Sequence, residues 1–390
     1  MARPDLVPTL RELCIRVVSD TFEKRPTFVG LQAEDIKSIT ERLPLDLPLE
    51  LAGDVIDDER YWWRRSTRRW RNSEVGAHGN SWKQLYFERN LQDALEQFDP
   101  EMSDLDQLRR LLSYSARFVR FLEITQLPSH LDLAHIFDCL DVSLCGLSLT
   151  YGMRDVGMDF ERGLFGMRLP DCRSLARCLE SCEALTCLSL SNNTLDDDGV
   201  RMLMSGMVDN LSVTHLDLSC NKIADRGVRA LAKVLDSRCT ITSLDLSDNV
   251  IHQEGGRALA RALKQAPALT RLNLALNQIG DEGIRAISHV LQDAWGLTHL
   301  SLSANSGSNE CVGELAALMQ TNTVLRILDV SCNELGPASG PIILDALAQN
   351  EGLTKLDVRL CGLETEDMLR VEQALRQRQD AEITERVMGR

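Results

Sequence analysis

The stretch Leu185–Asn193 reads LTCLSLSNN, and variants of it recur along the rest of the chain. The later copies are VTHLDLSCN from Val213, ITSLDLSDN from Ile241, LTRLNLALN from Leu269, LTHLSLSAN from Leu297, LRILDVSCN from Leu325 and LTKLDVRLC from Leu353. Each copy begins 28 residues after the one before it, so seven consecutive copies share one register. The pattern L-x-x-L-x-L-x-x-N at a fixed period is typical of leucine-rich repeats.

The remainder of each repeat has the spacing of a helix. Apolar residues such as Val228, Leu231 and Leu235 recur at intervals of three and four, which places them on one helix face. A glycine precedes these residues in four repeats, at Gly199, Gly227, Gly255 and Gly283. The repeat resembles the ribonuclease-inhibitor class. We expect an α/β leucine-rich repeat solenoid, with a curved parallel sheet and outer helices, whose units share one core.

An asparagine closes six of the seven copies. A buried amide satisfies backbone groups where the chain leaves a strand, so we interpret this column as structural and not as a binding site. The column consists of Asn193, Asn221, Asn249, Asn277, Asn305 and Asn333.

Three places depart from the pattern. LCGLSLTYG, from Leu144, indicates an eighth repeat with Gly152 in the place of asparagine, followed by an insertion near residues 151–169. In the fifth copy Gly307 and Cys311 replace the usual residues, which predicts an irregular turn. A charged, amphipathic helix from Glu364 onward is expected to cap the last repeat.

The chain therefore divides into three parts. We expect a helical N-terminal domain over residues 1–130, a solenoid of about eight units over 131–378, and a C-terminal tail over 379–390. The N-terminal third lacks the repeat, and LRELCIRVVSDTF has apolar residues near the helical period.

An arginine- and tryptophan-rich stretch runs from Arg60 to Arg71. Its arginines lie either on the outside of a helix with tryptophans in the core, or in a basic docking patch for an acidic protein surface such as a tubulin lattice. The patch consists of Arg64, Arg65, Arg68 and Arg69. Nucleic-acid binding is disfavoured, because Asp57, Asp58 and Glu59 directly precede the stretch.

Composition narrows the classes of function. The formal net charge of −15 disfavours general binding to nucleic acids and to anionic membranes. No apolar run approaches the roughly 20 residues that span a bilayer, and MARPDLVPTL shows no secretory apolar region. No P-loop, H-E-x-x-H or Rossmann motif is present, so we expect no catalysis and no cofactor.

The cysteines do not indicate a disulfide framework. Cys172, Cys178, Cys182 and Cys187 form the densest group among twelve, but their spacing is not that of a zinc site. They fall at apolar helix and strand positions, so we interpret them as buried thiols.

The residues between the strand leucines define the concave face, because side chains alternate along a strand. This face is polar, small and partly acidic. It is either a solvated surface or a site for a helix or extended segment that carries basic residues. The candidate protein-binding residues are Asp217, Asp245, Arg271, Asn273, Asp329, Lys355, Asp357 and Arg359.

Three further segments carry a family resemblance. They are LPLDLPLELAGDVIDDERYWWRRSTRRW, HGNSWKQLYFERNLQDALEQFDP and YGMRDVGMDFERGLF, within which DDExYW and HGNSWK are the most specific. Together with the repeats they resemble the T-complex-associated testis-expressed family, the leucine-rich repeat subunit five of the nexin–dynein regulatory complex.

The resemblance implies a structural role in the axoneme of cilia and flagella, within the cytoskeleton. It implies partners among the coiled-coil and leucine-rich repeat subunits of that complex, and contact with inner dynein arms or doublet microtubules. It implies regulation of motility through dynein, without catalysis or a cofactor. The residues themselves indicate no metal site, no nucleic acid and no membrane as partners.

A second interpretation comes from another class of protein. The segment before Trp70 also resembles an F-box, which together with leucine-rich repeats implies a ubiquitin-ligase substrate receptor. Pro48 interrupts the place where an F-box helix runs.

Overall fold

The computed structural model describes residues 9–99, 102–128, 131–152, 165–236, 238–293 and 296–388. It divides into two compact units. The first contains Met1–Gln97 and Ser103–Leu122, and the second contains Phe98–Met102 and Glu123–Arg390. Most of the insertion expected near 151–169 lies outside the described residues. No helix in the described ranges is both long and apolar enough to cross a bilayer.

The first unit is helical, as the sequence predicted. Its elements are α1 (Leu10–Asp20), η1 (Phe22–Lys24), α2 (Ala33–Thr40), α3 (Leu49–Val55), α4 (Glu59–Arg69), η2 (Gly76–His78), α5 (Trp82–Glu96) and α6 (Leu105–Ser115). Asp58 and Ser81 begin α4 and α5, because each side chain accepts a hydrogen bond from a backbone N–H of the first turn. Trp62 and Phe87 are fully buried and pack together at the centre of the unit.

The second unit is built on a nine-stranded sheet, counted over the described residues, with its strands in sequence order. The strands are β1 (Phe121–Leu127), β2 (Gly146–Tyr151), β3 (Cys187–Ser189), β4 (His215–Asp217), β5 (Ser243–Asp245), β6 (Arg271–Asn273), β7 (His299–Ser301), β8 (Ile327–Asp329) and β9 (Lys355–Asp357). From β2 to β9 every pair is parallel, with corresponding repeat positions opposite each other.

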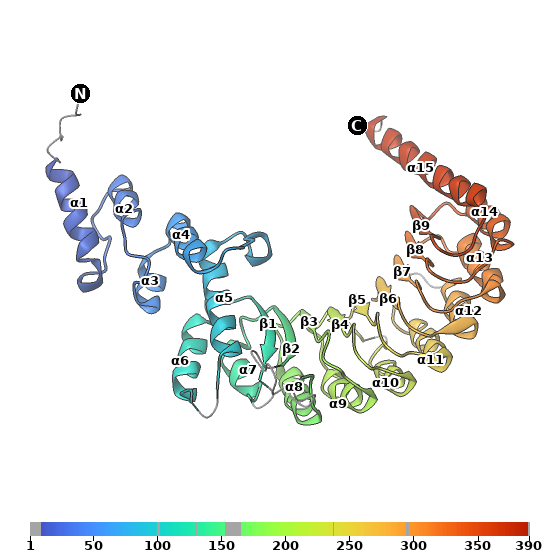
Figure 1. The fold of residues 1–390 in the computed structure, drawn as a ribbon, viewed down its shortest axis with the longest axis horizontal. Coiled ribbons are helices and arrows are strands. Elements are labelled where there is room, and N and C mark those ends of the chain that lie inside the picture. The colour runs from blue at the N-terminus through green and yellow to red at the C-terminus, as the bar shows by residue number, and fades with distance from the viewer. Residues whose placement is uncertain are drawn as a thin grey trace, which may run out of the picture. The chain divides into compact units, whose positions relative to one another are not determined.

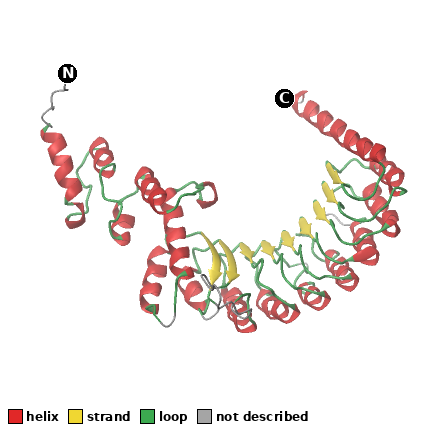
Figure 2. Ribbon diagram, in the orientation of Figure 1, coloured by secondary structure: helices red, strands yellow, loops and turns green. Residues whose placement is uncertain are grey.

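Helices cover the outer side of this sheet, and the strands line the inner curve (Figures 1 and 2). The helices are α7 (Ala134–Leu140), α8 (Leu169–Ser181), α9 (Asp197–Met207), α10 (Asp225–Leu231), α11 (Gln253–Leu263), α12 (Gly280–Leu291), α13 (Val312–Thr321), α14 (Ser339–Gln349) and α15 (Thr365–Met388). The expected curved solenoid with outer helices is therefore confirmed.

The first strand was not expected. We expected helices as far as residue 130, but FLEITQL over Phe121–Leu127 forms β1 next to β2. Its exposed and buried residues alternate, which is the period of a strand and not of a helix. The segment lacks the leucine spacing of the other repeats, so the repeat pattern alone did not reveal it. The sheet consequently has one strand more than the eight units expected.

The asparagine column is buried and structural, as predicted. The amide of Asn221 donates to the carbonyl oxygens of Leu190, Leu218 and Ser219 at 2.9–3.0 Å. Its Oδ1 accepts from the backbone N–H groups of Asn193 and Leu195. One side chain thus satisfies buried backbone groups of two repeats, which couples neighbouring repeats to each other.

Two further columns couple the repeats, and neither was predicted. Asp197 at the start of α9 accepts from the N–H groups of Ala224 and Gly227, at the start of α10, and Asp225 binds the next repeat in the same way. A Cβ atom on Gly227 would lie 2.7 Å from Asp197 Oδ1, which explains the glycine there. On the strand side, threonine hydroxyls donate to the carbonyl of the threonine 28 residues earlier. These pairs are Thr214 to Thr186, Thr242 to Thr214, Thr270 to Thr242 and Thr298 to Thr270.

The structure also describes the other two places where the sequence departs from the repeat pattern. Cys311 ends η5 (Asn309–Cys311), so the irregular turn expected in the fifth copy is a short 3-10 helix. Helix α15 packs on α14 and buries Val371 and Leu375 against the last repeat, as expected of a cap. The helix continues to Met388, so the expected tail from residue 379 begins within it.

One residue at the end of each of the seven copies from Leu185 onward adopts the left-handed region of backbone conformation. It directly precedes the asparagine column or its Cys361 equivalent, and φ at this position lies between 51° and 59°. The residues are Asn192, Cys220, Asp248, Leu276, Ala304, Cys332 and Leu360. Leucine is poorly suited to this region, which costs about 1–2 kcal/mol for a residue with a Cβ atom, whereas asparagine tolerates it.

Replacing Leu276 by asparagine is therefore expected to stabilise the solenoid. The side chain is 57% exposed, so little packing is lost, and relief of strain contributes about 0.5–1 kcal/mol. Thermal unfolding followed by circular dichroism measures the gain as a higher Tm. Leu211→Asn is the matched control, because Leu211 is 64% exposed and its φ is not positive. An equal shift for both variants contradicts the strain argument.

Candidate protein-binding surfaces

The concave face presents two aligned rows of side chains, one at each end of the short strands. The register places Asp217, Asp245, Asn273, Ser301, Asp329 and Asp357 opposite one another in one row. The other row contains His215, Ser243, Arg271, His299, Ile327 and Lys355. The face therefore has an acidic edge and a basic edge, about two residues apart along each strand. The sequence had predicted both columns.

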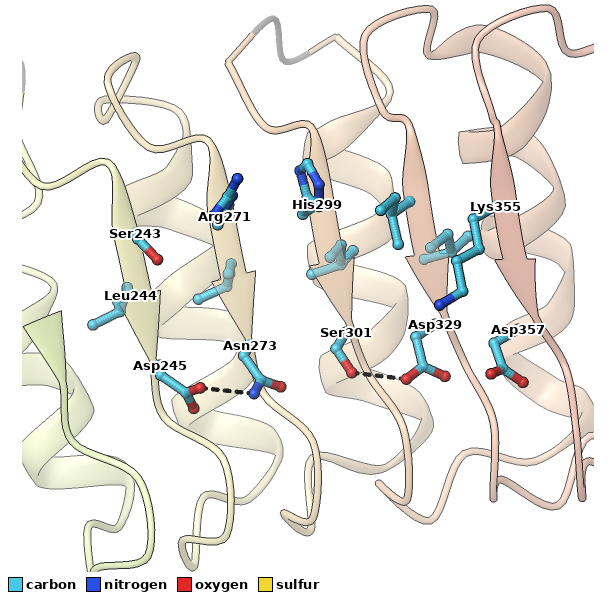
Figure 3. A pocket seen from close by; sticks show the side chains of 14 residues that line it. Ser243, Leu244, Asp245, Arg271, Asn273, His299, Ser301, Asp329, Lys355 and Asp357 are labelled. Atoms are coloured by element: carbon cyan, nitrogen blue, oxygen red, sulfur yellow. Dashed lines mark hydrogen bonds between the residues drawn. The ribbon is translucent and has the colours of Figure 1, made fainter. Parts of the chain in front are cut away.

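A shallow hollow of about 310 Å³ lies between the rows from β5 to β9. Figure 3 shows Arg271 and His299 along the basic row, and Lys355 reaching towards the acidic row. Leu244 and the other strand leucines form its floor. A partner that fits here must present polar groups of both signs to the rows.

The aspartates of the acidic row also have a local structural role. Oδ1 of Asp217, Asp245 and Asp329 each accepts the backbone N–H two residues later, at 2.9–3.0 Å. This contact closes the turn at the end of the strand. The second oxygen is shared along the row, because Asn273 donates to Asp245 Oδ2 at 2.9 Å and Ser301 donates to Asp329 Oδ2 at 3.3 Å (Figure 3). The sequence had not predicted these contacts.

Charge is paired at the C-terminal end of the face. Arg359, beyond β9, binds Asp357 through its guanidinium, and the closest distance is 2.6 Å. Hydrogen bonds from Arg359 lower the pKa of Asp357, and Arg359 itself remains exposed. In the basic row, burial and the neighbouring Arg271 lower the pKa of His299. His299 therefore contributes little positive charge at neutral pH, and Arg271 and Lys355 supply it.

The basic patch expected on α4 is only partly available. Arg65 is 7% exposed, donates to the carbonyl of Leu47 and lies over the ring of Tyr86, so it belongs to the core. Arg64 is half-buried and donates to backbone carbonyls of residues 40, 41 and 43. The helix turns both residues towards the neighbouring segments, which the sequence run did not reveal.

The other two arginines of that patch are exposed. Arg69 forms an ion pair with Asp93 at 2.9 Å and also donates to Asn90. Arg68 is exposed and has no ion-pair partner among the described residues. A docking patch of four free arginines on α4 is therefore not what the structure contains.

The two motifs most specific to the resemblance contact each other. Glu59, from DDExYW, accepts hydrogen bonds from the hydroxyl of Ser81 and the backbone N–H of Trp82, both in HGNSWK. Asp57 and Lys83 form an ion pair at 2.5 Å. These motifs thus join the start of α4 to the start of α5, which is a structural task.

Glu88 on α5 is a buried residue that the sequence analysis missed. It is 2% exposed, and its Oε1 accepts from the backbone N–H groups of Arg120 and Phe121, each at 2.8 Å. Its other oxygen contacts the ring of His78. A glutamate in a helix gives no sequence signal for burial, because its partners are distant along the chain.

The cysteine group consists of free thiols. Cys172 and Cys182 are buried, whereas Cys178 and Cys187 are half-buried. Burial raises the pKa of Cys172 and of Cys178 to about 12, so both stay protonated at neutral pH. In the described ranges, no cluster of three or more His, Cys, Asp or Glu residues is arranged to hold a metal ion.

Comparison with known proteins places these features in context. The Leucine Rich repeat family model matches residues 181–204, 209–232, 238–260, 266–288 and 321–340. A dynein regulatory complex subunit 5 from Chlamydomonas reinhardtii is 57% identical over 202 residues, which cover 52% of each chain. The subunit of the same name from Mus musculus is 34% identical over 232 residues, covering 53% of this chain and 47% of its own.

Two solved structures match this chain at low identity. An internalin from Listeria monocytogenes is 18% identical, with 67% of this chain and 69% of that chain covered and a TM-score of 0.40. The actin-binding site 2 of leiomodin-1 is 16% identical, with 57% and 96% covered and a TM-score of 0.31.

The match to the curated relatives spans about half of their length. The chain carries leucine-rich repeats and is similar, over about half of its length, to proteins named dynein regulatory complex subunit 5, which confirms the resemblance drawn from its sequence.

Proposed function

We propose that this chain is a non-enzymatic structural subunit of the axonemal dynein regulatory complex. In this role it holds other subunits in place between doublet microtubules and helps to regulate dynein-driven motility of cilia and flagella. The 57% identity to the Chlamydomonas subunit carries the proposal. The partners are the coiled-coil and leucine-rich repeat subunits of that complex, with inner dynein arms or the doublet microtubule as further contacts.

The construction of the second unit supports a scaffolding role. Each repeat is joined to the next through the strands, the asparagine column and the aspartate contacts between helices. In a solenoid each unit touches only its neighbours, so these contacts together determine its curvature. A body held in this way transmits force and keeps attached proteins at fixed spacing.

The concave face is the surface we assign to a partner subunit. Its acidic and basic rows run side by side across β5 to β9 and enclose the hollow. A helix with a basic edge and an acidic edge complements both rows, and coiled-coil proteins present such edges. The described residues do not favour the F-box alternative, since Glu59, within the segment that suggested it, binds the start of α5 inside the first unit.

A strain that lacks this protein tests the role. We expect altered waveform or beat frequency with doublets intact, and recovery on re-expression of the protein. The informative variant is Asp217→Asn, Asp245→Asn and Asp329→Asn combined, because asparagine keeps the oxygen that closes each turn and removes the charge. The oxygen that accepts from the neighbouring strand becomes an NH2 group, at a half-buried place where water can replace the lost contact. Its retention in salt-washed axonemes should fall several-fold, since three charged contacts are lost.

The matched control carries Asp20→Asn, Asp46→Asn and Asp106→Asn, which change the same charge at exposed positions of the first unit. It should be retained like the unaltered protein. Normal motility of the null strain contradicts the proposed role. Equal retention of the two triple variants would instead show that the concave face does not bind the partner subunit. The outer helices or the first unit would then make the contact.

A further inference from the structure

The outer faces of the solenoid helices carry an ordered system of charges. Five helices present an arginine at the same place of the repeat, at Arg173, Arg201, Arg229, Arg257 and Arg285. Three residues before Arg201, Arg257 and Arg285 the chain carries a carboxylate, at Asp198, Glu254 and Glu282, and the next repeat carries Glu310 at the same place. The system lies outside the concave face and was not part of the sequence predictions.

Most of these arginines are neutralised by the neighbouring carboxylates. Arg257 binds Glu254 and Glu282, both at 2.7 Å, and so links α11 to α12. Arg285 binds Glu282 at 3.3 Å and Glu310 at 3.4 Å. At these two places of the repeat α11 and α12 therefore present paired charges, whereas Arg261, one turn further along α11, is exposed and forms no ion pair with another described residue.

Helix α10 reverses this arrangement. The place held by a carboxylate in the repeats of α9, α11, α12 and α13 is occupied by Arg226, which precedes Arg229 by three residues. Lys233, in the turn after the helix, follows Arg229 by four, so the three cations form one stripe. All three are exposed, and none forms an ion pair with another described residue. The one acid of α10, Asp225, accepts backbone N–H groups of the next repeat.

We propose that this stripe, Arg226, Arg229 and Lys233, is a docking surface for an acidic polypeptide segment of a partner protein. A row of unpaired cations is unexpected in a chain with a formal charge of −15, where carboxylates to neutralise it are abundant. From Arg226 to Lys233 the stripe is about 10 Å long, which matches about three residues of an extended chain.

The charges on the neighbouring helices favour a narrow ligand over a broad one. Asp198 on α9 and Glu254 on α11 lie on either side, at a helix spacing of about 10 Å. Each forms an ion pair with an arginine of its own helix, Asp198 with Arg201 at 3.3 Å and Glu254 with Arg257 at 2.7 Å. A nucleic-acid duplex or a membrane is wider than one helix and would also cover these ion pairs, which carry no net charge. A single acidic segment that runs along α10 contacts the three cations without covering them.

Fluorescence anisotropy of a labelled poly-glutamate peptide with the purified full-length protein tests the proposal. We expect saturable binding that weakens as salt rises from about 50 to about 200 mM. The triple variant Arg226→Glu, Arg229→Glu and Lys233→Glu should bind about tenfold more weakly or worse, because attractive contacts become repulsive. The control Lys24→Glu, Lys37→Glu and Arg71→Glu alters the same net charge at exposed sites of the first unit and should bind normally.

A single substitution separates docking from stability. Arg226→Glu restores the carboxylate found in the other repeats, next to Arg201 and Arg229. It should weaken peptide binding several-fold while leaving Tm unchanged or higher. Equal loss of binding in the control, no loss in the triple variant, or tighter binding of a duplex oligonucleotide through the same three residues overturns the proposal.

Discussion

Replacing Asn249 by alanine should destabilise the solenoid by about 3 kcal/mol, because it leaves buried backbone groups without partners. Asn249 is 6% exposed, and its Oδ1 accepts from the backbone N–H of Ile223 at 3.0 Å. Its amide donates to carbonyl oxygens of Leu218 and Leu246, each at 3.0 Å. In the variant the two carbonyls still accept from the neighbouring asparagines, Asn221 and Asn277. The N–H of Ile223, in contrast, loses its side-chain acceptor.

Urea denaturation followed by circular dichroism measures this loss. Hydrogen exchange of the Ile223 amide locates it, and exchange there should accelerate before that of distant repeats, since solenoid units interact only with their neighbours. The control Asn273→Ala removes the same side chain from the half-buried concave face, where water replaces its contacts, and should cost less than about 1 kcal/mol. Similar losses for the two variants contradict the structural role of the asparagine column.

The second large effect is expected in the first unit. Glu88→Ala should lower the free energy of unfolding by about 3–5 kcal/mol. The substitution removes a buried carboxyl group that contacts two backbone N–H groups, a side-chain amide and an imidazole ring. Two backbone N–H groups, of Arg120 and Phe121, lose their acceptor. Gln84 and His78 lose a partner as well.

Tryptophan fluorescence suits this measurement, because four of the five tryptophans lie before residue 97 and Trp62 is fully buried. The control is Glu41→Ala, which breaks the exposed ion pair with Arg60 and should cost less than about 1 kcal/mol. A Glu88 variant as stable as this control contradicts the proposed buried network. Unfolding of the second unit, followed separately by hydrogen exchange, should change little.

Periodicity made the second unit predictable. The 28-residue register alone indicates which leucines are buried, which asparagines are structural and which side chains share a concave column. Each inference follows because a repeat in sequence becomes a translation in space, so residues 28 apart are neighbours. The same reasoning did not predict β1, because this strand lacks the leucine pattern and is identified only by its pairing with β2.

The arginines show where sequence patterns fail. Arg64 and Arg65 lie in a dense run of cations, yet both side chains donate hydrogen bonds to backbone carbonyls within the first unit. Arg226 lies in an inconspicuous part of a repeat, yet it belongs to the stripe without ion pairs. A local count of charges does not reveal which of them a neighbouring element neutralises.

The sequence by itself determined the solenoid and its structural asparagines, because both depend on spacing along the chain. Specific local segments such as HGNSWK also carried its similarity to dynein regulatory complex subunit 5. Only the tertiary structure decided how Glu88 is satisfied, which arginines remain free and that the acidic row also closes strand turns. The physical reason is that neutralisation and burial depend on partners that are distant in sequence and adjacent in space.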